Sequence, residues 1–321
     1  MTDKKDLSAV WQGRVDVEDP ELSRRLHQHV HADDLPVDYH SAPVLVGFAC
    51  DEGVRRNQGV PGAAEGPDAI RKALANLACS EDFEFFDAGD VTCRDGYLEA
   101  AQQKLANNLT RILESNGRPF VLGGGHEVGW ASYLGAQQFL QTHAPDKQLG
   151  ILNFDAHFDL RNPDPAPSSG TPFRQCQEWC HHNDVPFHYA VLGINPTANT
   201  DALFHFAFEH DVTWVEDLDC HMAAMPHLQQ QLRDWLQPLD FVYVTLCLDV
   251  FPAAYAPGVS APAALGVEPL VVFKLLQFLM DEAEQQNKQI LLVDVAEMNP
   301  SKDIDQRTAR LAARYIYQMM M

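Results

Sequence analysis

The sequence predicts an α/β fold in which a mainly parallel sheet lies between layers of helices. Short apolar runs, each near the length of a buried strand, recur along the chain. Most of these runs are continuously apolar rather than alternating, which is typical of strands that are covered on both faces. Helix-like segments lie between many of the runs, and a repeated strand-then-helix order indicates a parallel sheet.

The elements of the first half alternate clearly. In chain order, we expect strands at 42–49 (APVLVGFA) and 82–88 (DFEFFDA), with a helix at 66–78 between them, then a helix at 97–115, a strand at 118–124, a helix at 127–143 and a strand at 148–154. A segment rich in Pro, Ser and Gly, 161–172 (RNPDPAPSSGTP), is predicted to be a loop.

The second half continues the pattern. We expect 176–182 (CQEWCHH) to form a surface helix or loop rather than half of a structural zinc site, because no second paired cluster is present. The remaining expected strands are 188–194, 211–216, 240–248 and 288–297, with helices at 227–237 and 268–286. The sheet should therefore have about eight strands.

The chain is long enough for one large domain or two small ones, since it has 321 residues of which 46% are hydrophobic. It contains no internal repeat, and no linker comparable to the loop at 161–172 divides it. We therefore expect a single domain over residues 1–321, with an N-terminal extension at 1–41 and a catalytic core at 42–321.

The charge and the cysteines narrow the class of partner. A formal net charge of -22 repels phosphate backbones, which argues against nucleic acid but not against an acidic small molecule. No apolar stretch reaches the roughly 18 residues needed to span a membrane, and the N-terminus (MTDKKDLSAVWQG) lacks the apolar core of a signal peptide. Seven cysteines in a large chain make a disulfide framework improbable. We expect a cytoplasmic protein that acts on a small molecule.

Polar side chains follow four of the predicted strands. In open α/β sheets, ligands bind beyond the carboxyl ends of the strands. The residues at these ends are His126 and Glu127; Asp155, His157 and Asp159; Cys247 and Asp249; and Asp294 and Glu297. Each group alone has an ordinary explanation: a hydrogen-bonded loop histidine, a solvated polar loop, a helix cap at Asp249 or a solvated carboxylate at Glu297. Their joint placement favours a site that binds two metal ions.

The stretch 151–161 (ILNFDAHFDLR) sets a geometric condition on that site. In a fully extended strand, Asp155 and Asp159 would lie roughly 13 Å apart, too far to share one ion. The segment must therefore curl at the strand end, or serve more than one metal, or both. Carboxylates and imidazoles suit a hard or borderline divalent cation such as Mn²⁺, which would neutralise the carboxylates.

Four segments of the chain resemble the signature segments of the ureohydrolases, the family of arginase, agmatinase and formimidoylglutamase. They are GGGHE (123–127), NFDAHFDLR (153–161), TLCLDVFPAAYAPGVSAPAALG (245–266) and VAEMNP (295–300). The segment DEGVRRNQGVPGAAEGPDAIR (51–71) also resembles that family's N-terminal segment. The resemblance runs from about residue 42 to the C-terminus.

The resemblance implies a three-layer αβα sandwich with two Mn²⁺ ions per subunit. We also expect a homo-oligomer. It implies that His126 and Asp159 bind one ion, that His157 and Asp249 bind the other, and that Asp155 bridges them. The family normally has a further bridging aspartate in the third segment, where this chain has Cys247.

The resemblance also assigns catalytic roles. It places Glu297 beside the cationic group of the substrate. Asp159, or solvent bound to it, could pass a proton to the departing amine.

Within the family, three features resemble formimidoylglutamases. Gly125 stands before His126 where arginases and agmatinases usually have Asp, and the loops SSGTPFRQ (168–175) and VSAPAALG (259–266) are similar to those of that group. The implied reaction is the metal-dependent hydrolysis of N-formimidoyl-L-glutamate to L-glutamate and formamide, a step of histidine degradation. Arg161, Ser168 and Arg174 are the expected contacts of the substrate carboxylates.

Two other classes of function stay open on the sequence. One is another amidine or guanidine hydrolase, such as guanidinobutyrase, agmatinase or arginase; no clear counterpart of arginase's catalytic-loop histidine occurs in the segment NPDPAPSSGTPFRQ (162–175). The other is a metal-binding homologue without catalytic activity, for which Cys247 in place of a carboxylate is the best support.

Overall fold

The computed structural model describes residues 6–19, 22–32, 35–79 and 83–321, and their strands form one nine-stranded sheet. Every strand pairing in it is parallel. The strands are β1 (Val30–His31), β2 (Pro43–Ala49), β3 (Phe85–Thr92), β4 (Arg118–Gly123), β5 (Leu149–Phe154), β6 (His188–Ile194), β7 (Thr213–Glu216), β8 (Phe241–Cys247) and β9 (Gln289–Ala296). Their order across the sheet is β1-β3-β2-β4-β9-β8-β5-β6-β7.

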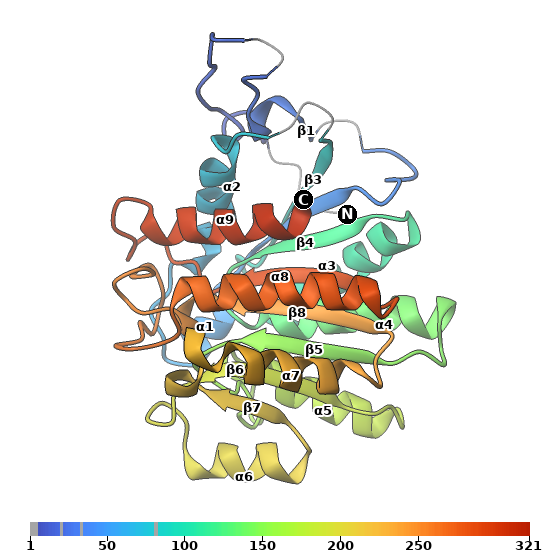
Figure 1. Ribbon diagram of the computed structural model, residues 1–321. Coiled ribbons are helices and arrows are strands. Elements are labelled where there is room, and N and C mark those ends of the chain that lie inside the picture. Colours follow the sequence, from blue (N-terminus) through green and yellow to red (C-terminus); the bar gives the residue numbers. More distant parts are fainter. Residues whose placement is uncertain (1–5, 20–21, 33–34, 80–82) are drawn as a thin grey trace.

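Helices cover both faces of the sheet (Figure 1). The α-helices are α1 (Glu52–Arg56), α2 (Gly66–Ala75), α3 (Leu98–Glu114), α4 (Val128–His143), α5 (Pro172–His182), α6 (Asp201–Glu209), α7 (Met225–Leu236), α8 (Pro269–Gln285) and α9 (Arg307–Met320). Apolar residues of α2, α7, α8 and α9 pack on one face, and those of α3, α4 and α5 pack on the other. This arrangement buries the continuously apolar strands on both sides, as their sequences require.

The predicted fold class is confirmed: a parallel sheet lies between two helical layers. The sheet has nine strands rather than about eight, because the two-residue strand β1 adds an edge beside β3. Such a short strand gives no apolar run in the sequence. The strand expected at 82–88 lies at Phe85–Thr92, and residue 82 is outside the described residues.

Some helices did not stand out in the sequence. Helices α6 and α9 were not predicted, and the segment 176–182 is the second half of α5. Cys176 and Cys180 lie on the buried side of α5, so that helix is not wholly a surface element. Within the part of the chain that is described, no helix is long and apolar enough to cross a membrane.

The sheet order explains how distant segments form one site. Strands β4, β9, β8 and β5 are neighbours at the centre of the sheet, although they are far apart in the chain. Because all four are parallel, their carboxyl ends meet at the same edge. The polar residues that follow these strands are therefore brought together.

Candidate metal centre and active-site cavity

His126 is placed by the tight turn between β4 and α4. The glycines before it allow close backbone approach: a Cβ atom on Gly124 would lie 1.7 Å from the carbonyl oxygen of Cys50, and one on Gly125 would lie 2.1 Å from Glu127 Oε2. The backbone N–H of His126 donates a hydrogen bond to Glu297 Oε1 at 2.9 Å. The glycine run thus lets the imidazole sit over the ends of the central strands.

The segment after β5 curls back, which is one of the alternatives that the spacing of its carboxylates allowed. Asp159 has a φ angle of 51°, in the left-handed region that non-glycine residues seldom adopt. As a result, Asp155 Oδ2 and Asp159 Oδ2 each lie 2.9 Å from His126 Nδ1. The spacing left open a curl, more than one metal, or both, and the structure shows the curl; strained backbone of this kind is typical of functional sites.

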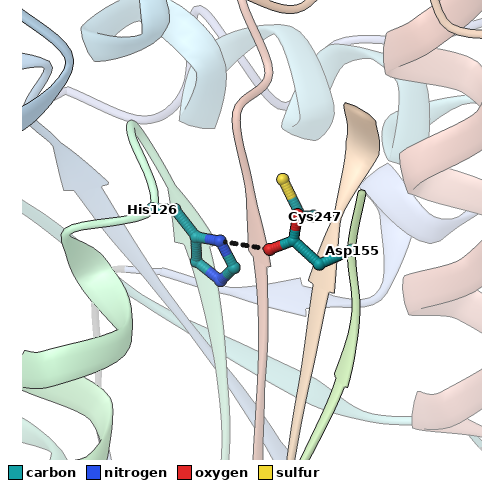
Figure 2. Close-up of side chains that lie close together, drawn as sticks. All are labelled: His126, Asp155 and Cys247. Atoms are coloured by element: carbon teal, nitrogen blue, oxygen red, sulfur yellow. Dashed lines mark ion pairs between the residues drawn. The ribbon is translucent and has the colours of Figure 1, made fainter. Parts of the chain in front are cut away.

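Two groups of side chains could each hold a metal ion. The first consists of His126, Asp155 and Cys247, which Figure 2 shows converging from three separate segments. The second consists of Asp155, His157 and Asp249, and His157 Nδ1 lies 3.2 Å from Asp249 Oδ2. In each group the potential ligand atoms lie within 4.8 Å of one another. Asp155 belongs to both groups, so its carboxylate could bridge two ions.

One buried atom supports a metal at the first group. His126 Nδ1 is buried and makes no hydrogen bond with the described residues, although two carboxylate oxygens lie 2.9 Å away. A buried nitrogen of this kind normally has a partner. An atom that faces two carboxylates without hydrogen-bonding geometry is well placed to ligate a cation together with them.

The local electrostatics favour cations as well. Burial, followed by the charge of Asp155, raises the pKa of Asp159 to about 6. Burial, followed by the charges of Asp249 and Glu127, raises the pKa of Glu297 to about 8. Burial also opposes ionisation of Asp155, but the neighbouring imidazoles of His126 and His157 outweigh it and lower the pKa of Asp155. Divalent cations would favour the ionised form of all these carboxylates.

Cys247 ends β8 and lies among these carboxylates. Its Sγ is 2.9 Å from Asp249 Oδ1 and belongs to the same potential metal-binding group as His126. Burial, followed by the charges of Asp155 and Asp249, raises the pKa of the Cys247 thiol well above its ordinary value. Without a cation the side chain is therefore a neutral thiol, whereas a metal would favour the thiolate.

A cavity of about 340 Å³ opens onto these groups. Its lining includes His126, His157, Asp159, Cys247, Asp249 and Glu297 together with Asn57, Gln58, Gly59, Val60, Arg161, Ser169, Ala198, Asn199, Leu203, Ser260 and Ala261. The loop at 57–60 is fixed at its far end: the Val60 N–H donates to Ser260 Oγ at 2.8 Å, and Asn299 Nδ2 donates to the Val60 carbonyl at 3.0 Å. A volume of this order accommodates a small-molecule substrate.

Of the three residues expected to bind the substrate, only one lines the cavity. Arg161 lines the cavity, and its guanidinium forms no ion pair with the described residues. Arg174 does not line it: its Nε donates to Glu178 Oε1 at 2.8 Å, and its guanidinium carbon lies 3.8 Å from the ring centroid of Phe206. Ser168 is also absent from the lining, which Ser169 joins in its place.

Several residues of the site were not predicted from the sequence. Asn57, Gln58, Asn199 and Ser260 lie in loops whose polar residues resemble any solvated loop, so only the fold reveals them. Thr245 is different, because it precedes Cys247 by two positions on the same strand and so shares its face. Its Oγ1 lies 3.0 Å from His126 Nε2.

Comparison with known proteins gives consistent matches. A model of the arginase family matches residues 41–321. A formimidoylglutamase of Ralstonia nicotianae is 47% identical over 312 residues, covering 97% of this chain and 94% of that protein. One of Aliivibrio fischeri is 44% identical over 326 residues, covering 96% and 93%.

Solved structures show the same fold. The formimidoylglutamase of Bacillus subtilis superposes with a TM-score of 0.80 at 20% identity, covering 95% of this chain and 93% of that one. A Trypanosoma cruzi formiminoglutamase solved with Mn²⁺ superposes with a TM-score of 0.72 at 25% identity, covering 87% of this chain and 92% of that one.

Proposed function

The chain belongs to the arginase family, and on that premise we propose that it hydrolyses N-formimidoyl-L-glutamate to L-glutamate and formamide, a step of histidine degradation. The names and nearly complete coverage of the similar formimidoylglutamases support this substrate. One structural observation carries the proposal furthest. One cavity is lined by members of both potential metal-binding groups, by Glu297 and by Arg161, whose guanidinium forms no ion pair with the described residues.

Those groups complement the substrate chemically. N-formimidoyl-L-glutamate has a cationic formimidoyl group at one end and two carboxylates at the other. Glu297 would hold the cation, and Arg161 would form a charge-assisted contact with a carboxylate. Gly170 leaves room for this arginine, since a Cβ atom there would lie 2.8 Å from Arg161 Cδ.

The metal ligands proposed for two Mn²⁺ ions are the members of the two groups together with Asp159, whose Oδ2 lies 2.9 Å from His126 Nδ1. His126, Asp159 and Cys247 would hold one ion, His157 and Asp249 would hold the other, and Asp155 would bridge them. Bound divalent ions supply one piece of chemistry, because they lower the pKa of water toward about 7 and so make a nucleophile available at neutral pH.

The side chains of the chain perform the remaining tasks. Glu297 fixes the formimidoyl group, and its orientation is set by the hydrogen bond that it accepts from the His126 N–H. Water adds to the formimidoyl carbon, and the bond from that carbon to the glutamate nitrogen breaks. Asp159, or solvent bound to it, would accept a proton from the attacking water and pass it to the departing amine. The products, formamide and glutamate, account for all atoms of the substrate and the water.

The activity assay is direct. Purified protein loaded with Mn²⁺ is expected to release formamide and glutamate from N-formimidoyl-L-glutamate, and to act much more slowly on agmatine, arginine and 4-guanidinobutyrate. Agmatine has no carboxylate for Arg161, so it should be a poor substrate. Faster turnover of any of these competitors, or no turnover of the formimidoyl compound, would overturn the proposal.

Replacement of Arg161 by alanine is expected to raise KM for N-formimidoyl-L-glutamate roughly 10- to 100-fold, because a charge-assisted hydrogen bond is worth about 1.5–3 kcal/mol. Steady-state kinetics measure the effect. Arg174→Ala is the matched control, since that arginine is already paired with Glu178. Similar KM increases in both variants, or an increase only in Arg174→Ala, would remove Arg161 from the carboxylate site.

Cys247 should make one ion weaker or sensitive to oxidation. A thiolate is softer than the usual carboxylate and favours Zn²⁺ or Fe²⁺ over Mn²⁺, whereas a neutral thiol leaves one ion short of a ligand. Elemental analysis is expected to show fewer than two tightly bound Mn²⁺ ions per chain, and thiol oxidation should reduce turnover. Two tightly bound ions in both wild type and Cys247→Ala, with turnover insensitive to oxidant, would contradict this role.

Three further expectations stay predictions: the single domain, the homo-oligomer and the cytoplasmic location. The activity assay also distinguishes the proposed enzyme from a metal-binding homologue without activity. Such a homologue would bind metal without turnover on any amidine or guanidine.

A further inference from the structure

A row of polar residues lies directly beneath the metal-binding groups. Asn153 on β5, Thr245 on β8 and Asp294 on β9 are register partners across three neighbouring strands. All three are completely buried. Side chains two positions apart on a strand share a face, so Asn153 lies below Asp155 and Thr245 lies below Cys247. A buried polar row inside continuously apolar strands needs a reason, because it costs stability unless it is fully hydrogen-bonded.

The centre of the row contacts a proposed metal ligand. Thr245 Oγ1 lies 3.0 Å from His126 Nε2, and His126 Nδ1 is the nitrogen that faces Asp155 and Asp159. If Nδ1 binds a metal ion, the ring proton resides on Nε2, so this N–H donates to the Thr245 hydroxyl oxygen. The hydroxyl can therefore select the tautomer and fix the plane of the imidazole.

The ends of the row are held as well. Asp294 Oδ2 accepts hydrogen bonds from Ser132 Oγ at 2.6 Å and Tyr243 OH at 2.5 Å, and its Oδ1 makes no hydrogen bond with the described residues. Asp294 is the register partner of Thr245, and the Thr245 side chain is a hydrogen-bonding neighbour of its carboxylate, so this carboxylate can accept the Thr245 hydroxyl proton. At the other end, Asn153 Nδ2 donates to Asp155 Oδ2 at 3.1 Å.

From these contacts we infer that Thr245 is a positioning residue, whose hydroxyl links the buried Asp294 carboxylate to His126 and so orients that imidazole toward a metal ion. The inference rests on the metal site of the proposed function. Outer partners of this type typically change metal affinity 10- to 100-fold when they are removed. Thr245 itself touches neither metal nor substrate.

The test compares variants that differ by a single group. Thr245→Ser and Thr245→Ala both lack the methyl group and differ only in the hydroxyl, whereas Thr245→Val keeps the shape of threonine and lacks the hydroxyl. Mn²⁺ affinity is measured by calorimetric titration of metal-stripped protein. Electron paramagnetic resonance counts the free ion, and thermal unfolding of the metal-free protein reports on the fold.

We expect Thr245→Ser to bind Mn²⁺ like wild type, and Thr245→Ala and Thr245→Val to bind one ion 10- to 100-fold more weakly. Thr110→Val is the remote control, because it removes a threonine hydroxyl that bonds only within the α3–α4 region. If one variant does not fold, the other still gives the comparison with serine.

Two results would overturn the inference. Equal weakening in Thr245→Ser and Thr245→Ala would assign the effect to the methyl group, and unchanged affinity in Thr245→Ala and Thr245→Val would remove the role altogether. A wild-type protein that binds no Mn²⁺ is a distinct outcome, because it would overturn the metal site of the proposed function together with this inference.

Discussion

Glu297→Gln is expected to abolish most turnover while its metal content stays equal to that of the wild type. Glu297 is buried, lines the cavity and belongs to neither potential metal-binding group. Its proposed partner is the cationic formimidoyl group, and glutamine preserves the shape of the side chain while removing its charge. Loss of a preorganised electrostatic contact costs about 2–4 kcal/mol, or roughly 30- to 1,000-fold in kcat/KM. Steady-state kinetics measure the loss of turnover, and metal analysis of the same preparation measures the metal content.

A neighbouring carboxyl group provides the matched control. Glu127 is as deeply buried as Glu297, but it does not line the cavity, and its Oε1 accepts a hydrogen bond from the Gly53 N–H at 2.9 Å. Glu127→Gln should therefore keep most of the turnover. Normal turnover in Glu297→Gln, or equal losses in the two variants, would show that Glu297 does not hold the substrate cation.

Asp155→Asn is expected to release both metal ions and to reduce turnover by about 10³-fold or more. Asp155 is the one residue shared by the two potential metal-binding groups. Asparagine keeps the shape and can still accept the hydrogen bond that the His157 N–H donates to Asp155 Oδ1 at 2.7 Å, but it loses the anionic charge. Bound metal ions stabilise a transition state of this type by several kcal/mol, and this free energy corresponds to the expected loss of turnover.

Asp159→Asn tests the difference between a ligand that is shared by both metal ions and a ligand that binds only one. Asp159 faces His126 alone among the histidines of the site, so its loss should weaken one ion and leave the other. Elemental analysis and Mn²⁺ titration distinguish the two variants. Retention of one full equivalent of Mn²⁺ by Asp155→Asn would contradict a bridging role.

The sequence predicted those site residues that are polar and directly follow an apolar strand. Asp155, His157 and Asp159 interrupt an apolar run, and the distance argument called for a curl, more than one metal, or both. The left-handed Asp159 produces the curl. The same reasoning could not reach Thr245, because its importance depends on being the register partner of Asp294 and on contacting His126, which is 119 residues away in the chain.

The two arginines illustrate a second limit. Arg161 and Arg174 flank the same Pro- and Gly-rich loop and have equal claims in the sequence. Their roles separate only in three dimensions: Arg174 lies on α5 and reaches Glu178 one turn along that helix, whereas Arg161 precedes the loop and lines the cavity. The first turn of α5 was expected to be part of the loop, so the direction in which Arg174 points from that helix could not be predicted.

The most direct test of this account is an anomalous diffraction map at the manganese absorption edge from crystals grown with Mn²⁺. Two peaks are expected, both in contact with Asp155, one beside His126 and Cys247 and the other beside His157 and Asp249. A single peak, or peaks that do not share Asp155, would contradict it.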